Sequence, residues 1–166
     1  VVRLVGSEMC IRDRYEEPMR EFELESYKKL CDKLDIPILA AECSDGSHWN
    51  AAEFIRRDAC DIMRTSTHYK GGFTGGMKVG HVAEAFGMKA EVHGGGHNNL
   101  HLCLALPNNT YYEDLVIDVE DIEAKGKGQL KFENGMYSFK EQVAGVGIEY
   151  DHDELETISI QKYKKF

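Results

Sequence analysis

The sequence predicts an α/β fold in the form of a partial (β/α)8 barrel followed by a hairpin-containing tail. Between residues 15 and 113, short apolar runs alternate with stretches of helical periodicity, which is typical of βαβ units and a parallel sheet. The expected strand ends recur about once per βα unit, at residues 16, 42, 66, 93 and 113. A complete barrel takes roughly 250 residues, so the 166 residues of this chain can supply only part of one.

The expected elements follow one another along this segment. Apolar residues at i, i+3 and i+4 spacing mark the helices, and short apolar runs mark the buried strands. In chain order we expect a helix over 19–34, a strand over 36–40, a helix over 51–55, a strand over 59–63, a helix over 75–86, a strand over 89–92 and a helix over 97–106. Gly87 is placed to end the third of these helices, and Pro107 follows the last one.

These patterns divide the chain into three segments. Residues 1–14 show neither strand alternation nor a helical stripe, and we expect them to be a non-native stretch derived from a sequencing adapter. Residues 15–113 form the barrel segment. Residues 114–166 are interpreted as a tail that packs outside the barrel, with Asn134-Gly135 as a strong hairpin signal.

The bulk composition excludes several classes of protein. A chain that is 42% hydrophobic can form a packed core. The net charge of -9 gives no electrostatic support to nucleic-acid binding, and no apolar run approaches the roughly 20 residues that span a bilayer. Five cysteines without a paired spacing suggest reduced thiols, so we expect a cytoplasmic protein without a membrane partner.

Two carboxylates occupy the ends of consecutive expected strands. Glu16 and Glu42 could share a hard divalent cation there, because Mg²⁺ prefers oxygen ligands. Taken alone, the pattern is explained equally well by capping or solvated carboxylates.

Several segments, taken in order, resemble the mandelate racemase type of the enolase superfamily. Tyr15-Glu16-Glu17-Pro18 is similar to that family's Glu-Glu-Pro motif on the fourth barrel strand. The other matching segments are 36–42, 70–75, 92–93, 111–113 and 143–148. The resemblance covers nearly everything after Arg14 and implies that the chain holds barrel strands four to eight.

The resemblance also implies a reaction and a set of site residues. Glu16 and Glu42 would ligate Mg²⁺, His93 would transfer a proton, and Glu113 would hydrogen-bond the carboxylate of a small-molecule substrate. The α-proton of that carboxylate substrate would be removed to give an enediolate, and the favoured outcome is dehydration of an acid sugar by a lyase. A racemase, epimerase or cycloisomerase of the same superfamily remains an alternative, as does a non-catalytic barrel fragment. The full-length protein is expected to be a homo-oligomer.

One position departs from the family pattern. An Asp usually ends strand six and orients the strand-seven His, but Ser66 stands there in this chain. A hydroxyl can still orient a ring nitrogen, yet without the carboxylate His93 suits a general acid or a substrate hydrogen-bonder as well as a base. His68, Lys70 and Trp49 are the candidate substrate contacts; each could equally be a loop or core-edge residue.

Two further expectations concern what surrounds the site. Strand alternation places Arg64 and Glu91 one layer below Ser66 and His93, where we expect them to form a buried ion pair. The family's general base on strand two and its first metal ligand on strand three fall outside this chain. The isolated chain is therefore expected to be inactive, and its open strand edges to make it unstable or self-associating.

Overall fold

Four parallel strands form the sheet that organises the first part of the chain. This computed structural model describes residues 13–113, 130–140, 144–148 and 157. The strands are β1 (Tyr15–Glu16), β2 (Ile38–Ala40), β3 (Ile62–Thr65) and β4 (Ala90–Val92), in the spatial order β1-β2-β3-β4. The helices that follow them in turn are α2 (Leu24–Lys33), α3 (Ser47–Arg56), α4 (Gly72–Ala85) and α5 (His97–Ala105).

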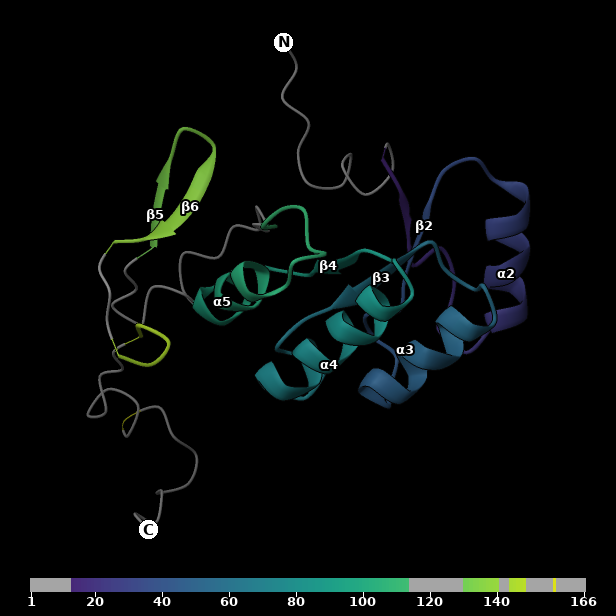
Figure 1. Ribbon diagram of the computed structural model, residues 1–166, viewed down its shortest axis with the longest axis horizontal. Coiled ribbons are helices and arrows are strands. Elements are labelled where there is room, and N and C mark those ends of the chain that lie inside the picture. The colour runs from purple at the N-terminus through teal and green to yellow at the C-terminus, as the bar shows by residue number, and fades with distance from the viewer. Residues whose placement is uncertain (1–12, 114–129, 141–143, 149–156, 158–166) are drawn as a thin grey trace. The chain divides into compact units, whose positions relative to one another are not determined.

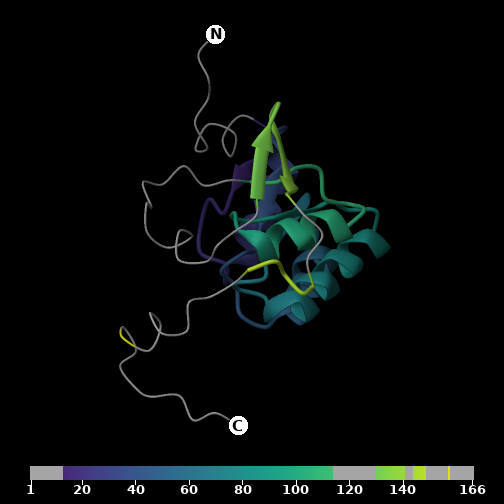
Figure 2. The ribbon, with the colours of Figure 1, turned by 90° about the vertical axis from the view of Figure 1, so that its left-hand side faces the viewer.

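The strand order places the helices on one face of the sheet. Each strand pairs in parallel with the next one along the chain, and such crossovers are almost always right-handed, so successive helices fall on the same side. Helices α3, α4 and α5 pack in succession, as the two views show (Figure 1 and Figure 2). This singly wound arrangement is the one that curls into a barrel, and it confirms the predicted fold class.

The hydrophobic core lies between the strands and these helices. Ile38, Ala40 and Met63 point into it from the strands and meet Phe54 of α3 and Val79 of α4, all of them at most 1% exposed. The alternate strand residues point to the other face, which is the inside of a barrel.

That inner face is unusually polar. It carries Glu16 of β1, Arg64 of β3 and Glu91 of β4, and Arg64 lies directly opposite Glu91 in the strand register. Arg64 is 0% exposed and Glu91 is 1% exposed. Charged side chains are almost never buried unless they are paired, so the inner face is where a functional site is expected.

Hydropathy located the elements well and their ends less well. The expected helices and strands between residues 19 and 106 are present, but β3 runs from Ile62 to Thr65 instead of over 59–63. Polar residues extend this strand because their side chains have partners: the Thr65 hydroxyl donates to the carbonyl of Gly76, 3.1 Å away. Helix α2 begins at Leu24, later than the apolar stripe that starts at Met19.

The expectation of a strand that ends at Glu113 is wrong. Residues 107–113 form no regular element. Their asparagines satisfy the open edge of β4 instead, because the N–H of Ala90 donates to the Asn108 carbonyl and that of Val92 donates to Asn109 Oδ1, both 3.1 Å away. The segment still brings Glu113 to the carboxyl end of the sheet.

The tail contains the predicted hairpin. Strands β5 (Leu130–Glu133) and β6 (Met136–Phe139) are antiparallel, and Asn134 and Gly135 join them with φ angles of 55° and 78°. Positive φ at both central residues is what a type I′ turn requires, so the hairpin prediction is confirmed. The chain divides into two units, residues 1–116 and 117–166. Most of the expected tail, 114–166, and most of the segment 1–14 that was expected to be non-native lie outside the described residues.

No helix in the described ranges is long and apolar enough to cross a membrane.

Candidate active site

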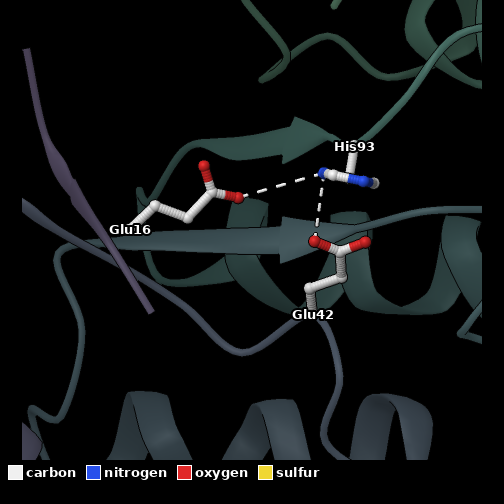
Figure 3. Close-up of side chains that lie close together, drawn as sticks. All are labelled: Glu16, Glu42 and His93. Atoms are coloured by element: carbon white, nitrogen blue, oxygen red, sulfur yellow. Dashed lines mark ion pairs between the residues drawn. The ribbon is translucent and has the colours of Figure 1, made fainter. Parts of the chain in front are cut away.

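Three side chains predicted from the sequence meet at the carboxyl end of the sheet. Glu16 ends β1, Glu42 follows β2, and His93 follows β4 directly. His93 Nδ1 lies 3.0 Å from Glu42 Oε2 and 4.0 Å from Glu16 Oε1, and the other ring nitrogen points away from both carboxylates (Figure 3). Because parallel strands end at the same edge, residues 77 positions apart in sequence become neighbours here.

Glu113 and Arg64 complete the cluster. Glu113 Oε2 lies 3.3 Å from His93 Nδ1 and accepts the backbone N–H of Gly94 at 3.1 Å. The Arg64 guanidinium forms ion pairs with Glu16 at 2.8 Å and with Glu113 at 2.6 Å, and its Nη2 lies 3.1 Å from His93 Nδ1. Arg64 thus lies within the site, whereas strand alternation had placed it one layer below Ser66 and His93.

The expected ion pair between Arg64 and Glu91 is wrong. The two residues are buried and adjacent in register, but their side chains have other partners. The carboxylate of Glu91 accepts the backbone N–H of Thr110 at 3.1 Å and the hydroxyl of the same residue at 2.5 Å. The long side chain of Arg64 instead extends towards the strand ends. There its guanidinium pairs with Glu16 and Glu113 and is also close enough to Glu42 for their charges to interact.

Burial dominates the electrostatics of Glu42. Desolvation raises the pKa of this carboxyl to about 8, the neighbouring Arg64 opposes the rise, and the carboxylates of Glu17, Glu16 and Glu113 add to it. Its Oε1 atom is buried and has no hydrogen-bond partner among the described residues. A cation at this oxygen would both satisfy it and favour the ionised form.

His93 experiences opposing influences. Burial lowers its pKa, Arg64 lowers it further, and the carboxylates of Glu113, Glu16 and Glu17 act in the opposite direction. The sequence had suggested a His without the carboxylate that usually ends strand six, since Ser66 stands there. The structure surrounds it with several, and burial together with the arginine still outweighs them.

The cluster fits a hard divalent cation. One atom from each of Glu16, Glu42 and His93 lies within 4.8 Å of the others, a separation that one ion could bridge. Mg²⁺ is typically held by one or two carboxylates and keeps several waters. The two glutamates match that preference, whereas a ring nitrogen is a less suitable ligand for Mg²⁺.

Ser66 and Lys70 lie close to the cluster but face elsewhere. The Ser66 hydroxyl accepts the backbone N–H of Tyr69 at 3.1 Å, so it closes the turn after β3 and does not orient the ring of His93. Lys70 is 2% exposed, and its ammonium donates to the carbonyls of Ala41 at 2.7 Å and Ser44 at 2.8 Å.

The other two expected substrate contacts are on the surface. His68 is exposed, and its Nδ1 lies 3.5 Å from Asn99 Nδ2. Trp49 is 70% exposed, and its ring lies against that of His48 with centroids 4.0 Å apart. His68 therefore lies in the loop beside the cluster, while Trp49 belongs to the outer helix α3.

Sequence reasoning missed two residues that support the site. Asn99, 0% exposed, accepts the N–H of Thr67 at 2.9 Å and donates to the carbonyl of His93 at 2.6 Å, so it ties together the loops after β3 and β4. Glu17 accepts the N–H groups of Glu42 and Cys43. A polar residue on the buried face of a helix was the available signal for Asn99; nothing in the strand pattern indicated Glu17.

Comparison with known families agrees with this geometry. The family described as enolase C-terminal domain-like matches residues 13–154, which is most of the chain. The chain belongs to this family. The resemblance to the mandelate racemase type of the enolase superfamily is thereby confirmed. The family match begins at residue 13 and so includes Arg14. Arg14 is 4% exposed, and its Cζ atom lies 4.4 Å from the centroid of the Tyr111 ring.

Individual relatives of this enolase C-terminal domain-like chain are dehydratases and epimerases. It is 29% identical over 127 residues to an arabinonate dehydratase of Saccharolobus solfataricus, covering 73% of this chain and 33% of that protein. It is 32% identical over 74 residues to an L-Ala-D/L-Glu epimerase of Clostridium acetobutylicum, covering 45% of this chain and 20% of the other.

A solved structure also overlaps most of this chain. The D-glucarate dehydratase from Agrobacterium tumefaciens, complexed with magnesium, matches with a TM-score of 0.79 and 37% identity. The match covers 92% of this chain and 41% of that one. The chain therefore spans between a fifth and about two fifths of the relatives it matches.

Proposed function

We propose that the complete protein carrying this chain is a Mg²⁺-dependent lyase that dehydrates an acid sugar. The observation that carries the proposal is the convergence of Glu16, Glu42 and His93 at the carboxyl end of the sheet, with ligand atoms within 4.8 Å. The similarity to an arabinonate dehydratase and to a magnesium-containing glucarate dehydratase supports the choice of substrate class. The substrate would be a small-molecule carboxylate, and we extend the proposal to a cytoplasmic homo-oligomer.

Each residue of the cluster has a role in this proposal. Glu16 and Glu42 would hold the cation, which supplies charge that stabilises the enediolate oxyanion as it develops. Glu113 would share a proton with the substrate carboxylate and so fix its orientation. Arg64 would keep the buried glutamates close together by balancing their charge.

His93 would move the proton. Its Nδ1 faces carboxylates, which favours a proton on that nitrogen and leaves the opposite nitrogen free to face a substrate. A lowered pKa makes its protonated form a readier proton donor. This suits a general acid that assists departure of the β-hydroxyl, whereas removal of the α-proton would fall to a group upstream of this chain.

An epimerase or racemase is the second candidate. The segment 32% identical to an L-Ala-D/L-Glu epimerase favours it, since such a reaction shares removal of the α-proton and differs in its second step. A cycloisomerase would share the same first step. A non-catalytic role for the barrel fragment is the remaining alternative.

One experiment separates these reactions. The complete protein is incubated with Mg²⁺ and a panel of aldonic and aldaric acids in D₂O, and the products are followed by NMR. A 2-keto-3-deoxy acid supports the dehydratase. Deuterium incorporation at the α-carbon without loss of water supports an epimerase or racemase, and ring closure supports a cycloisomerase.

The controls address the site and the fragment. The Glu42→Gln variant should abolish turnover while the exposed Glu84→Gln variant should not. No reaction with any acid in the panel would leave the non-catalytic reading. The chain of 166 residues by itself should show no turnover, because the residues expected to complete the site are upstream.

A further inference from the structure

Lys70 lies in the loop between β3 and α4 and has an unusual environment for a lysine. Its side chain is 2% exposed. The ammonium donates to the carbonyl of Ala41 at 2.7 Å, to the carbonyl of Ser44 at 2.8 Å and to the hydroxyl of Ser44 at 3.3 Å. An ammonium has three N–H donors, so these acceptors use all of them and leave none for a substrate.

The acceptors of this ammonium flank Glu42. Ala41 precedes Glu42 directly, and Ser44 follows two positions later. The Ser44 hydroxyl also donates to the Ala41 carbonyl at 2.9 Å, so the turn is closed on itself as well as by the lysine. On the other side of the turn, Glu17 accepts the backbone N–H groups of Glu42 and Cys43. The backbone that carries Glu42 is thus held from the β1 side and from the β3 side.

The backbone of Lys70 is itself fixed in place. The hydroxyl of Ser47, at the start of α3, donates to the Lys70 carbonyl at 3.0 Å. The same carbonyl packs against Gly75 of α4 so closely that a Cβ there would lie 1.4 Å from the oxygen. The lysine therefore projects from a rigid point, which is what a residue needs to position another.

A charged group at this place has a cost that packing alone would not require. Burial lowers the pKa of Lys70, and the nearby carboxylates of Glu17 and Glu42 oppose the shift. A methionine would fill a similar volume without the cost of desolvating a charge. Backbone carbonyls turned towards one point, however, need a donor with several N–H groups, and an ammonium is the side chain that supplies them.

We propose that Lys70 is a positioning residue for Glu42: it fixes the turn that presents this carboxylate to the divalent cation. The inference rests on the metal-dependent function proposed above. It gives the loop after β3 a part in the metal site without making Lys70 a ligand, because the ammonium is bound to the turn. Residues that orient metal ligands commonly change metal affinity by about 10- to 100-fold when they are replaced.

The test compares Mg²⁺ binding by the complete protein and its variants in isothermal titration calorimetry. Lys70→Met should raise the Kd for Mg²⁺ by about tenfold or more, whereas Lys33→Met, at the exposed end of α2, should leave it unchanged. Hydrogen exchange, followed without metal, should become faster at the amides of Glu42 and Cys43 in Lys70→Met. Exchange in β3 should stay as it is.

The outcomes separate positioning from simple packing. If Lys70→Met lowers Tm but binds Mg²⁺ as tightly as the parent, Lys70 is only a structural residue and the proposal is overturned. Should Lys70→Met not fold, Ser44→Ala takes its place: it removes one acceptor of the ammonium, and a Kd unchanged from the parent would equally overturn the proposal.

Failure of the proposed function gives a different result. If the parent protein does not bind Mg²⁺, the metal-dependent function is wrong. The hold of Lys70 on the turn is still decided in that case by exchange at the Glu42 and Cys43 amides. Unchanged exchange there would refute it on its own.

Discussion

The apparent affinity for Mg²⁺ should depend steeply on pH, and the buried carboxyl of Glu42 should be the cause. Burial raises its pKa to about 8, against an ordinary value of 4.5. A cation can bind only the ionised form, so binding at lower pH must first displace a proton. With a pKa of about 8, the Kd should fall roughly fiftyfold between about pH 6 and about pH 8, and less than about twofold over the next unit.

Isothermal titration calorimetry at each pH, in buffers of different ionisation enthalpy, measures both the Kd and the number of protons released. Close to one proton per Mg²⁺ should be released at about pH 7. Glu42→Gln should lose measurable binding, and the exposed Glu84→Gln should keep the parent's pH profile. A Kd that is flat from about pH 6 to about pH 9, with no proton released, would refute the assignment of a protonated Glu42 in the metal-free site.

The stability of the metal-free protein should change with pH in the opposite direction to the Mg²⁺ affinity, and the same carboxyl is the cause. Because its folded-state pKa is raised, the folded state binds a proton more tightly than the unfolded state, so the stabilising contribution is complete below about 4.5 and is lost as the pH rises through about 8. His93, with a lowered pKa, contributes the opposite slope below its ordinary value of 6.5. Burial also raises the pKa of the cysteine thiols above their ordinary value of 9.0, so urea unfolding of the parent is compared with that of Glu42→Gln between about pH 7 and about pH 8. Over that range the parent should lose more stability than Glu42→Gln does.

Four further substitutions test the packing of the site and the core. Arg64→Met should destabilise the metal-free protein by about 3–5 kcal/mol, because it leaves buried carboxylates unpaired; a free energy of urea unfolding equal to the parent's would contradict the ion pairs. Phe54→Ala should cost about 3–5 kcal/mol in the same assay, and Phe86→Ala, 67% exposed, about 0.5 kcal/mol or less; equal costs would contradict the core assignment. Asn99→Ala should reduce kcat more than it raises KM, because it frees the loop of His93; steady-state kinetics that show only a higher KM would count against this role.

The convergence of the site could be predicted because it follows from topology. Residues at the ends of neighbouring parallel strands must meet at one edge, so Glu16, Glu42 and His93 needed only a correct count of strands. The predicted meeting of these side chains is correct although some strand boundaries were misplaced. Glu113 also reaches the site although no strand precedes it, because residues 107–113 still run beside β4.

Side-chain direction was not predictable in the same way. Alternation assigns a residue to a face, and it placed Arg64 and Glu91 correctly inside and in register. It says nothing of how far a long side chain reaches along the strand. The guanidinium of Arg64 extends to Glu16 and Glu113. The carboxylate of Glu91 instead accepts hydrogen bonds from the backbone N–H and the hydroxyl of Thr110, which follows α5.

Loop residues were the least predictable of all. Lys70 was expected to face the substrate because it lies in a loop at the functional end of a barrel, where loops usually carry chemistry. Its ammonium instead turns inward to carbonyl groups. Only the spatial approach of two loops creates those acceptors, and no local sequence pattern records it.

The serine at position 66 shows how His93 can have carboxylate neighbours although none comes from the loop after β3. In this structure Ser66 closes its own turn, and His93 is surrounded by carboxylates from three other segments, Glu16, Glu42 and Glu113. Those carboxylates would raise the pKa of an imidazole, but Arg64 is within 3.1 Å and the ring is desolvated, so the net shift is downward. A histidine with a lowered pKa holds an added proton weakly and releases it readily. Proton donation in one direction is therefore better served by this arrangement than the two-way exchange that a racemase requires, which is a physical reason to test dehydration first.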